Sequence, residues 1–251
     1  MSPHVLQGIR GISRDVLDFF FPPLCLSCGE KLLPGEGFFC SRCHGAFESL
    51  PLPLCPVCGA PLGNKSLEKN RCPKCPTGVI YFDAAHAPLL YHGPVVDGIL
   101  ALKFHSRLEL AAFFARILLY YIKMEMKTPD FEGIVPVPLH YRRFYKRGYN
   151  QSEEIGRELS RYLDLPLWPE AVRRSRRTSP QTRLSTHADR KKNVRRAFQP
   201  AFPEPVKDRH VLLLDDVYTT GSTLNECSRV LKDVGARKVT ALTVCRALSI
   251  D

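Results

Sequence analysis

The chain has 251 residues, of which 44% are hydrophobic and 24% charged. This composition predicts a folded protein with a real core and excludes disordered and fibrous classes. The formal charge is +11, and residues 140–196 carry nearly all of it, with 16 Lys and Arg against 6 Asp and Glu. Such a concentration favours polyanionic partners, although a solvated basic face gives the same charge.

Residues 1–21 are predicted to form an amphipathic helix. Apolar residues recur there at helical spacing, namely Val5, Ile9, Ile12, Val16 and Phe20. Arg14 and Asp15 interrupt the apolar pattern and no small-residue cleavage site follows, which argues against a signal peptide. We expect the helix to pack on the protein; the alternative is that it rests on a membrane surface. No apolar run is long enough for a membrane span, so we expect a cytoplasmic protein.

Residues 22–79 are rich in Cys, Gly and Pro and need an added constraint to fold. Eight of the ten cysteines form four Cys-x-x-Cys pairs: Cys25/Cys28, Cys40/Cys43, Cys55/Cys58 and Cys72/Cys75. Two such pairs supply the four thiolates of one tetrahedral Zn²⁺, so the sequence predicts a double zinc ribbon with two structural ions. The gaps of 11, 11 and 13 residues favour consecutive sites, while joining the first pair to the third remains an alternative. Cys227 and Cys245 stand alone and are predicted to be small core residues.

Residues 80–251 alternate strand and helix signals, which predicts an α/β domain with a parallel sheet. We expect short strands within 81–91, helices over 95–104 and 108–126, and a strand over 134–138. A helix capped by Asn150 or Ser152 follows, and then a long basic loop over 173–196. The apolar run 211–214 predicts a buried strand, 222–234 a helix and 238–245 a last strand.

Residues 211–223, VLLLDDVYTTGST, join the apolar strand to two carboxylates, a short hydroxyl-rich loop and a helix start. Backbone N–H groups and hydroxyls at a helix N-terminus favour an anion such as phosphate. Gly221 allows close backbone approach, and Asp215 with Asp216 suits vicinal sugar hydroxyls or Mg²⁺. The alternative is that the two carboxylates belong to a simple capping turn.

This stretch resembles the phosphoribosyl pyrophosphate (PRPP) motif of the type I phosphoribosyltransferases. With residues 134–152, IVPVPLHYRRFYKRGYNQS, and the paired cysteines, the chain is similar over almost its whole length to the ComF family of competence-associated proteins. The resemblance implies a type I phosphoribosyltransferase-like domain over 80–251, preceded by the helix 1–21 and the double ribbon 22–79.

The resemblance also implies roles for individual residues. Asp215 and Asp216 are expected to hold the ribose hydroxyls of PRPP together with Mg²⁺. The residues expected to hold the 5′-phosphate are Thr219, Thr220, Gly221, Ser222 and Thr223. Those expected to face the pyrophosphate are Pro138, His140, Arg142 and Arg143. Those expected in a mobile loop that closes over PRPP are Thr178, Gln181, Arg190 and Asn193, along with Leu184 and Phe198.

One position departs from the purine-salvage members, which place an Asp general base where this chain has Thr219. Two functions therefore stay open. The first is phosphoribosyl transfer to an unknown acceptor with release of pyrophosphate, in support of DNA uptake. The second is a non-catalytic module that senses PRPP or binds single-stranded DNA and works with other DNA-uptake proteins.

Overall fold

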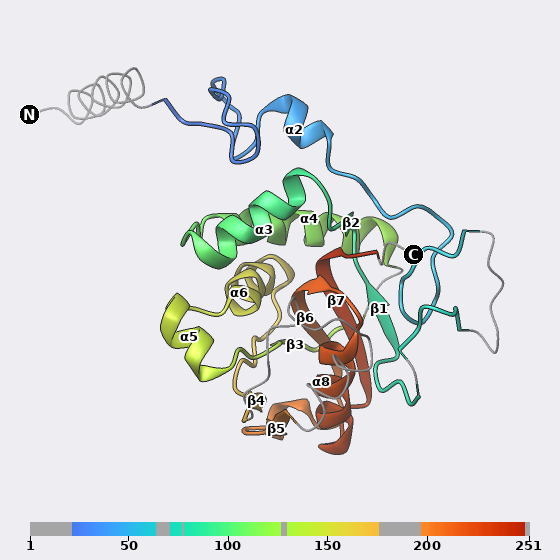
Figure 1. Cartoon of the computed structure of the whole chain (residues 1–251). Coiled ribbons are helices and arrows are strands. Elements are labelled where there is room, and N and C mark those ends of the chain that lie inside the picture. The colour runs from blue at the N-terminus through green and yellow to red at the C-terminus, as the bar shows by residue number, and fades with distance from the viewer. Residues whose placement is uncertain (1–21, 64–70, 77, 127–129, 176–196, 249–251) are drawn as a thin grey trace, which may run out of the picture.

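A computed structural model describes residues 22–63, 71–76, 78–126, 130–175 and 197–248 (Figure 1). A parallel sheet has the strand order β1-β7-β6-β3, and β2 also pairs with β7. Its strands are β1 (Ala84–His86), β2 (Leu89–Leu90), β3 (Gly133–Pro136), β6 (His210–Tyr218) and β7 (Lys238–Arg246). The expected α/β fold with a parallel sheet core is confirmed. Within the described ranges, no helix is both long enough and apolar enough to cross a bilayer.

Helices cover both faces of the sheet, because successive apolar side chains of β6 point to opposite faces and both faces must be buried. Leu212 and Leu214 point into one buried cluster, while Val211 and Leu213 point into a second on the opposite face. The first cluster contains α3 (Pro94–Phe104), α4 (Leu110–Glu125) and α6 (Gln151–Leu163), and the second contains α8 (Ser222–Asp233). A strand that is apolar on both faces is thereby fully buried, as the sequence predicted.

Most of the predicted elements occur near their expected bounds, and three differences matter for the site. Strand β6 does not end at its two carboxylates but continues to Tyr218. The chain after β3 forms a helix, α5 (Tyr141–Arg147), where we expected only a turn. The expected loop 173–196 is flanked by a small antiparallel pair, β4 (Val172–Arg174) and β5 (Phe198–Pro200), so its first residues belong to a strand. Two further short elements are the helices α2 (Ser41–Gly45) and η2 (Glu204–Val206).

The two ribbons begin with the same hairpin. In the first, the Cys25 N–H donates to the Glu30 carbonyl at 2.8 Å, and Gly29 has a φ of 72°. In the second, the Cys55 N–H donates to the Ala60 carbonyl at 2.8 Å, and Gly59 has a φ of 69°. A positive φ is easily adopted by glycine, which explains why one follows each first Cys-x-x-Cys pair.

The ribbons pack onto different parts of the domain. In the first, Ser27 donates to Asp97 of α3 at 2.6 Å, and the Phe39 ring lies 5.7 Å from that of Phe113 on α4. In the second, the Val57 carbonyl accepts from the N–H of Ala85 on β1 at 2.8 Å. The first ribbon therefore joins the core cluster of α3 and α4, and the second joins the cluster of α8.

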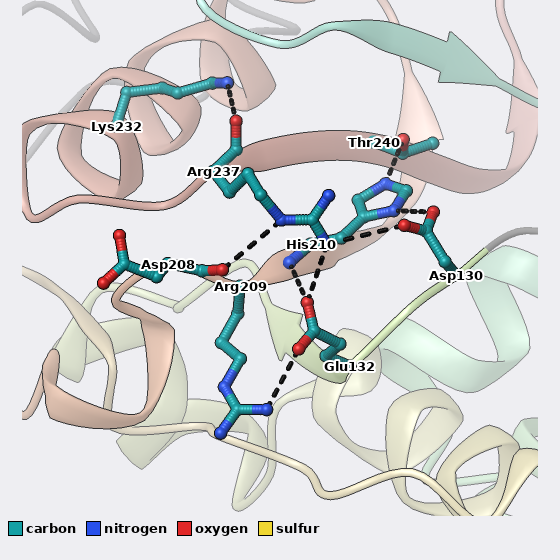
Figure 2. Close-up of polar contacts among 8 residues, drawn as sticks. All are labelled: Asp130, Glu132, Asp208, Arg209, His210, Lys232, Arg237 and Thr240. Carbon is teal, nitrogen blue, oxygen red and sulfur yellow. Dashed lines mark hydrogen bonds and ion pairs between the residues drawn. The ribbon is translucent and has the colours of Figure 1, made fainter.

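A polar cluster lies at the amino end of β6 (Figure 2). The buried His210 ring contacts Asp130 Oδ1 at 2.6 Å through Nδ1 and Thr240 Oγ1 at 2.9 Å through Nε2. Glu132 accepts from the His210 N–H at 2.8 Å and pairs with Arg237 at 2.9 Å. Burial lowers the pKa of His210, so the ring is neutral at pH 7. This cluster fixes the start of β6 at the edge of the sheet opposite the candidate site.

We predict that Gly133→Ala destabilises the fold and perturbs Trp168, the only tryptophan. A Cβ at position 133 would lie 2.3 Å from the indole ring of Trp168, and the Trp168 backbone N–H donates to the Ile134 carbonyl at 2.8 Å. Overpacking of this kind costs about 1–3 kcal/mol. Denaturant unfolding followed by tryptophan emission measures both effects. Gly37→Ala is the control because a Cβ there meets nothing within 4 Å. Equal stability of the two variants would contradict the close packing of Gly133 against the Trp168 ring.

Candidate functional site

The predicted site residues gather where the parallel strands end. Strand β3 leads through Pro138 and His140 into α5, and β6 leads through residues 219–221 into α8. Because both strands run in the same direction, their carboxyl ends lie at one edge of the sheet, where α/β proteins bind ligands. The fold thus brings together the two segments that the sequence analysis assigned to PRPP.

The loop between β6 and α8 has the form expected of an anion site. Gly221 has a φ of 73° and directly precedes the first residue of α8. The Thr220 and Ser222 hydroxyls lie 2.9 Å apart, and the Gly221 carbonyl accepts from the Asn225 N–H at 2.8 Å. No acidic residue occupies the first turn of α8, so the positive end of the helix dipole is not neutralised there. Thr219 and Thr223 flank this loop and also take part in polar interactions.

Asp215 lies half-buried beside the start of α6. Its Oδ1 accepts from the Ser152 hydroxyl at 2.9 Å and from the Asp216 N–H at 2.9 Å. Burial raises the pKa of Asp215 to about 7, and the adjacent Asp216 carboxylate adds to the rise. Carboxylates with a perturbed pKa are typical of functional sites.

Asp216 pairs with Lys103, a residue that the sequence analysis missed. The Lys103 ammonium at the end of α3 lies 2.7 Å from Asp216 Oδ2, and Asp216 is only 5% exposed. Burial alone would lower the pKa of Lys103, but the Asp216 carboxylate outweighs it and the pKa is raised. Asp216 is buried because β6 continues past it and Lys103 of α3 covers it. The only signal for Lys103 was a lysine inside an apolar helical run.

The turn after β3 is held by side-chain hydrogen bonds. The buried His140 caps α5, with Nδ1 accepting from the Arg142 N–H at 3.3 Å. Asn150 caps α6, and its amide donates to the Val137 carbonyl at 3.1 Å. Pro138 is half-buried in this turn, and the Arg142 side chain is exposed. These contacts fix the direction of α5 relative to the sheet.

Arg143 lies close enough to repel both Arg147 and Arg174 at this edge. Burial lowers the pKa of Arg174 on β4, and the Arg143 guanidinium of α5 lowers it further. Burial likewise lowers the pKa of Arg147, which the Asp216 carboxylate opposes and Arg143 reinforces. Arg174 and Arg147 were not predicted as site residues. Together with Lys103 these cations outnumber the two carboxylates, which favours a polyanionic ligand.

The predicted loop residues are Thr178, Gln181, Arg190 and Asn193, with Leu184, and they lie outside the described residues. The flanking chain is described: the Ser175 N–H donates to the Ala197 carbonyl at 3.0 Å, beside the β4–β5 pair. Phe198, which the sequence analysis assigned to this loop, is instead a buried residue of β5. Ser175 and Ala197, which flank the segment, therefore lie side by side next to the β4–β5 pair.

The eight paired cysteines form two separate clusters. Cys25, Cys28, Cys40 and Cys43 make the first and Cys55, Cys58, Cys72 and Cys75 the second, with the sulfur atoms of each within 4.8 Å of one another. This confirms the consecutive arrangement and rejects the interleaved one. Cys227 and Cys245 are buried away from both clusters, as predicted.

The sulfur spacing fits a tetrahedral metal ion. Zn–S bonds of about 2.3 Å place the thiolates of a tetrahedron about 3.8 Å apart. The observed Sγ–Sγ distances include 3.7 Å for Cys55 to Cys75, 3.5 Å for Cys58 to Cys72 and 3.7 Å for Cys28 to Cys40. Burial would raise the pKa of Cys25, but backbone N–H groups donating to its sulfur lower it to about 6. Four cysteines close each site, so the ions are structural.

Comparison with known proteins adds family membership to this geometry. Residues 16–76 match the double zinc ribbon domain, and residues 150–249 match the phosphoribosyl transferase domain. The DNA utilization protein YhgH of Escherichia coli (strain K12) is 37% identical over 232 residues, covering 90% of this chain and 98% of that protein. The chain belongs to the family that includes the DNA utilization protein YhgH and competence protein F. Competence protein F of Haemophilus influenzae is 32% identical over 91% of the chain and 99% of its own length. Competence protein ComFC of Streptococcus pneumoniae is 27% identical, covering 88% and 99%.

We predict two zinc ions per chain, and one ion in either Cys28→Ser or Cys75→Ser. Each variant removes one thiolate from one cluster and leaves the other intact, because the clusters share no residue. Elemental analysis of freshly purified protein measures the content. Less than one zinc in the wild type, or the loss of both ions from either variant, would contradict two independent sites.

Proposed function

We propose that this protein binds PRPP with Mg²⁺ at the carboxyl edge of the sheet. The observation that carries the proposal is the β6–α8 segment, where Asp215 and Asp216 precede a hydroxyl-rich loop at a helix N-terminus. In this arrangement the loop 219–223 holds the 5′-phosphate and the carboxylates face the ribose hydroxyls. Mg²⁺, when bound, would supply charge neutralisation for the pyrophosphate.

The basic side chains beside the loop support pyrophosphate binding. Arg143 lies near enough to Arg174 to lower the pKa of Arg174, and a bound polyanion would offset that repulsion. The Lys103 ammonium lies 2.7 Å from Asp216 Oδ2 and so supplies a counter-charge for that buried carboxylate. His140 and Pro138 present the turn after β3 to the same edge. The 5′-phosphate of PRPP would thus contact the loop that follows β6, and its pyrophosphate the turn that follows β3.

We further propose that the protein acts in DNA uptake or use, as the names of its relatives indicate for them. Thiolate zinc sites suit the reducing cytoplasm, which is where we place it. Phosphoribosyl transfer to an acceptor would break the bond from C1′ to pyrophosphate and form one to the acceptor nucleophile, with Arg and Mg²⁺ stabilising the leaving group. Thr219 stands where a carboxylate base is found in purine salvage, so any acceptor must be activated in another way.

We predict that Asp215→Asn weakens Mg-PRPP binding by about tenfold to a hundredfold. A hydrogen bond to a charged group contributes about 1.5–3 kcal/mol, and the amide keeps the size of the side chain. Calorimetric titration measures the affinity. Asp164→Asn, at the exposed end of α6, is the control for the loss of one carboxylate. Unchanged affinity in a folded Asp215→Asn variant would refute the ribose assignment.

We also predict that wild-type affinity for PRPP falls as the pH decreases through about 7. The raised pKa of Asp215 means that the acid form gains population below that pH, and a protonated carboxyl accepts hydrogen bonds less well. The asparagine of Asp215→Asn cannot titrate. The affinity profile of this variant therefore includes protonation of the ligand but not of residue 215. The difference between the two affinity profiles therefore isolates Asp215. Parallel profiles from pH 6 to pH 8 would contradict the prediction.

A second candidate activity, binding of single-stranded DNA, is favoured by the surface of α5. Tyr141, Phe144 and Tyr145 are 55%, 44% and 83% exposed beside the basic residues of this helix. Exposed rings stack bases for about 1–3 kcal/mol each, and basic residues follow the phosphates. Tyr149, which follows α5, is instead buried, and its hydroxyl donates to the Leu102 carbonyl. It belongs to the core cluster that contains α3, α4 and α6.

We predict salt-sensitive binding of single-stranded DNA that Arg142→Ala with Arg143→Ala weakens. The log affinity should fall with log salt at a slope of about −0.7 per phosphate contacted. Lys123→Ala with Lys238→Ala removes two exposed charges elsewhere and is the control. Electrophoretic or fluorescence titration measures binding with and without saturating Mg-PRPP. Undetectable binding at physiological salt, or equal affinity in both double variants, would end this proposal.

A further inference from the structure

The second ribbon meets the phosphate-binding loop at a buried arginine at the end of β7. Arg246 is 4% exposed, and its Nη1 donates to the Cys58 carbonyl at 2.6 Å. Its Nη2 lies 4.0 Å from the Cys58 sulfur. The guanidinium carbon lies 3.8 Å from the centre of the Tyr218 ring. Arg246 therefore contacts a predicted zinc ligand on one side and the end of β6 on the other.

Arg246 lacks a carboxylate partner among the residues that the structure describes. A buried guanidinium requires an opposing charge, because desolvation of a lone ion is costly. The four thiolates of the second site carry more negative charge than one Zn²⁺ neutralises. With zinc bound, these thiolates would supply the counter-charge of Arg246, whose guanidinium contacts both the carbonyl and the sulfur of Cys58.

Tyr218 contacts both Arg246 and Gly221 of the loop 219–223. The ring is 2% exposed, and its hydroxyl lies 2.2 Å from where a Cβ of Gly221 would be. Pro76, directly after the zinc ligand Cys75, lies 3.1 Å from the same point. Gly221 has a φ of 73° and is the N-cap residue of α8. The backbone of the loop at Gly221 is therefore packed against the Tyr218 ring, which Arg246 contacts, and against Pro76 of the second ribbon.

Other contacts join the second ribbon to the same helix. The chain just after the ribbon is tied to Asn225 of α8, whose amide donates to the Val79 carbonyl at 2.9 Å and accepts from the Tyr81 N–H at 2.8 Å. The first ribbon makes its contacts with α3 and α4 instead. Only the second ribbon is placed to affect the loop directly.

We propose that Arg246 is a positioning residue that couples zinc binding in the second ribbon to ligand affinity at the loop 219–223. This inference rests on the proposed binding of PRPP at that loop. With zinc bound, Cys58 and Pro76 are fixed, Arg246 holds the Tyr218 ring, and Gly221 keeps the conformation that presents the start of α8. Without zinc these supports are lost together. Coupling between two binding sites is reciprocal, so PRPP must also tighten zinc binding at this site.

The test measures both directions of the coupling in the full chain. Calorimetry first gives the affinity of the zinc-loaded wild type for Mg-PRPP. Equilibrium competition with a zinc chelator then gives the affinity of each ion with and without saturating Mg-PRPP. We expect Mg-PRPP to tighten one of the two ions by about fivefold to a hundredfold. Cys28→Ser, which lacks the first ion, should keep both the PRPP affinity and the full effect on its remaining ion.

Two variants at position 246 separate coupling from simple loss of structure. Arg246→Met keeps a side chain of similar length without charge or donors, and is expected to weaken PRPP binding and abolish the effect of PRPP on zinc. Arg246→Lys keeps the charge and is expected to retain part of both. Zinc content and unfolding are measured for each.

Three outcomes are distinct. PRPP-dependent tightening of the second ion that disappears in Arg246→Met supports the coupling. If the wild type binds PRPP but neither ion changes in affinity, the coupling is refuted and the proposed function stands; the wild-type measurement decides this even if both variants fail to fold. Absence of PRPP binding in the wild type refutes the proposed function and this inference with it.

Discussion

The parallel direction of β3, β6 and β7 is the constraint on which the rest of the structure depends. It brings the chain after β3, the loop after β6 and Arg246 at the end of β7 to one edge of the sheet, although they are far apart in sequence. The buried charged residues lie at this edge because it is where the carboxyl ends of the strands meet. Asp216 with Lys103, and Asp215 with Ser152, are satisfied by elements that cross this edge. The same edge receives the second ribbon.

The features predicted from sequence were those with local signals. Four Cys-x-x-Cys pairs fix a ligand set through spacing alone, and the order of the pairs matched the two clusters. The run 211–223 predicts a buried strand followed by a helix, because apolar, carboxylate and hydroxyl residues follow one another without interruption. In both cases neighbours in sequence remain neighbours in space.

The residues missed from sequence act through long-range packing. Lys103 reaches Asp216 across 113 positions of chain, and Arg246 reaches Cys58 across 188. Neither lies in a motif, and each looks like an ordinary charge beside an apolar run. The extension of β6 past Asp216 was also missed, because a carboxylate pair usually ends a strand unless a cation covers it. Pairing partners of this kind follow from topology, which the one-dimensional pattern does not contain.

The ribbons are closely integrated with the domain that follows them. We keep residues 22–79 and 80–251 as the proposed sequence units, but cysteines of each ribbon lie in core clusters shared with the sheet and its helices. The second metal site shares its core cluster with α8, the helix that follows the loop 219–223, whereas the first shares its cluster with α3 and α4. The second structural ion is therefore the one that we propose influences binding at this edge.

The most direct measurement of the central claim is an experimental structure of the zinc-loaded protein with Mg-PRPP. The account predicts the 5′-phosphate within the loop 219–223, the ribose hydroxyls at Asp215 and Asp216, and the pyrophosphate toward Pro138, His140 and Arg143. Density for the ligand at another place, or an empty loop at saturating Mg-PRPP, would contradict it.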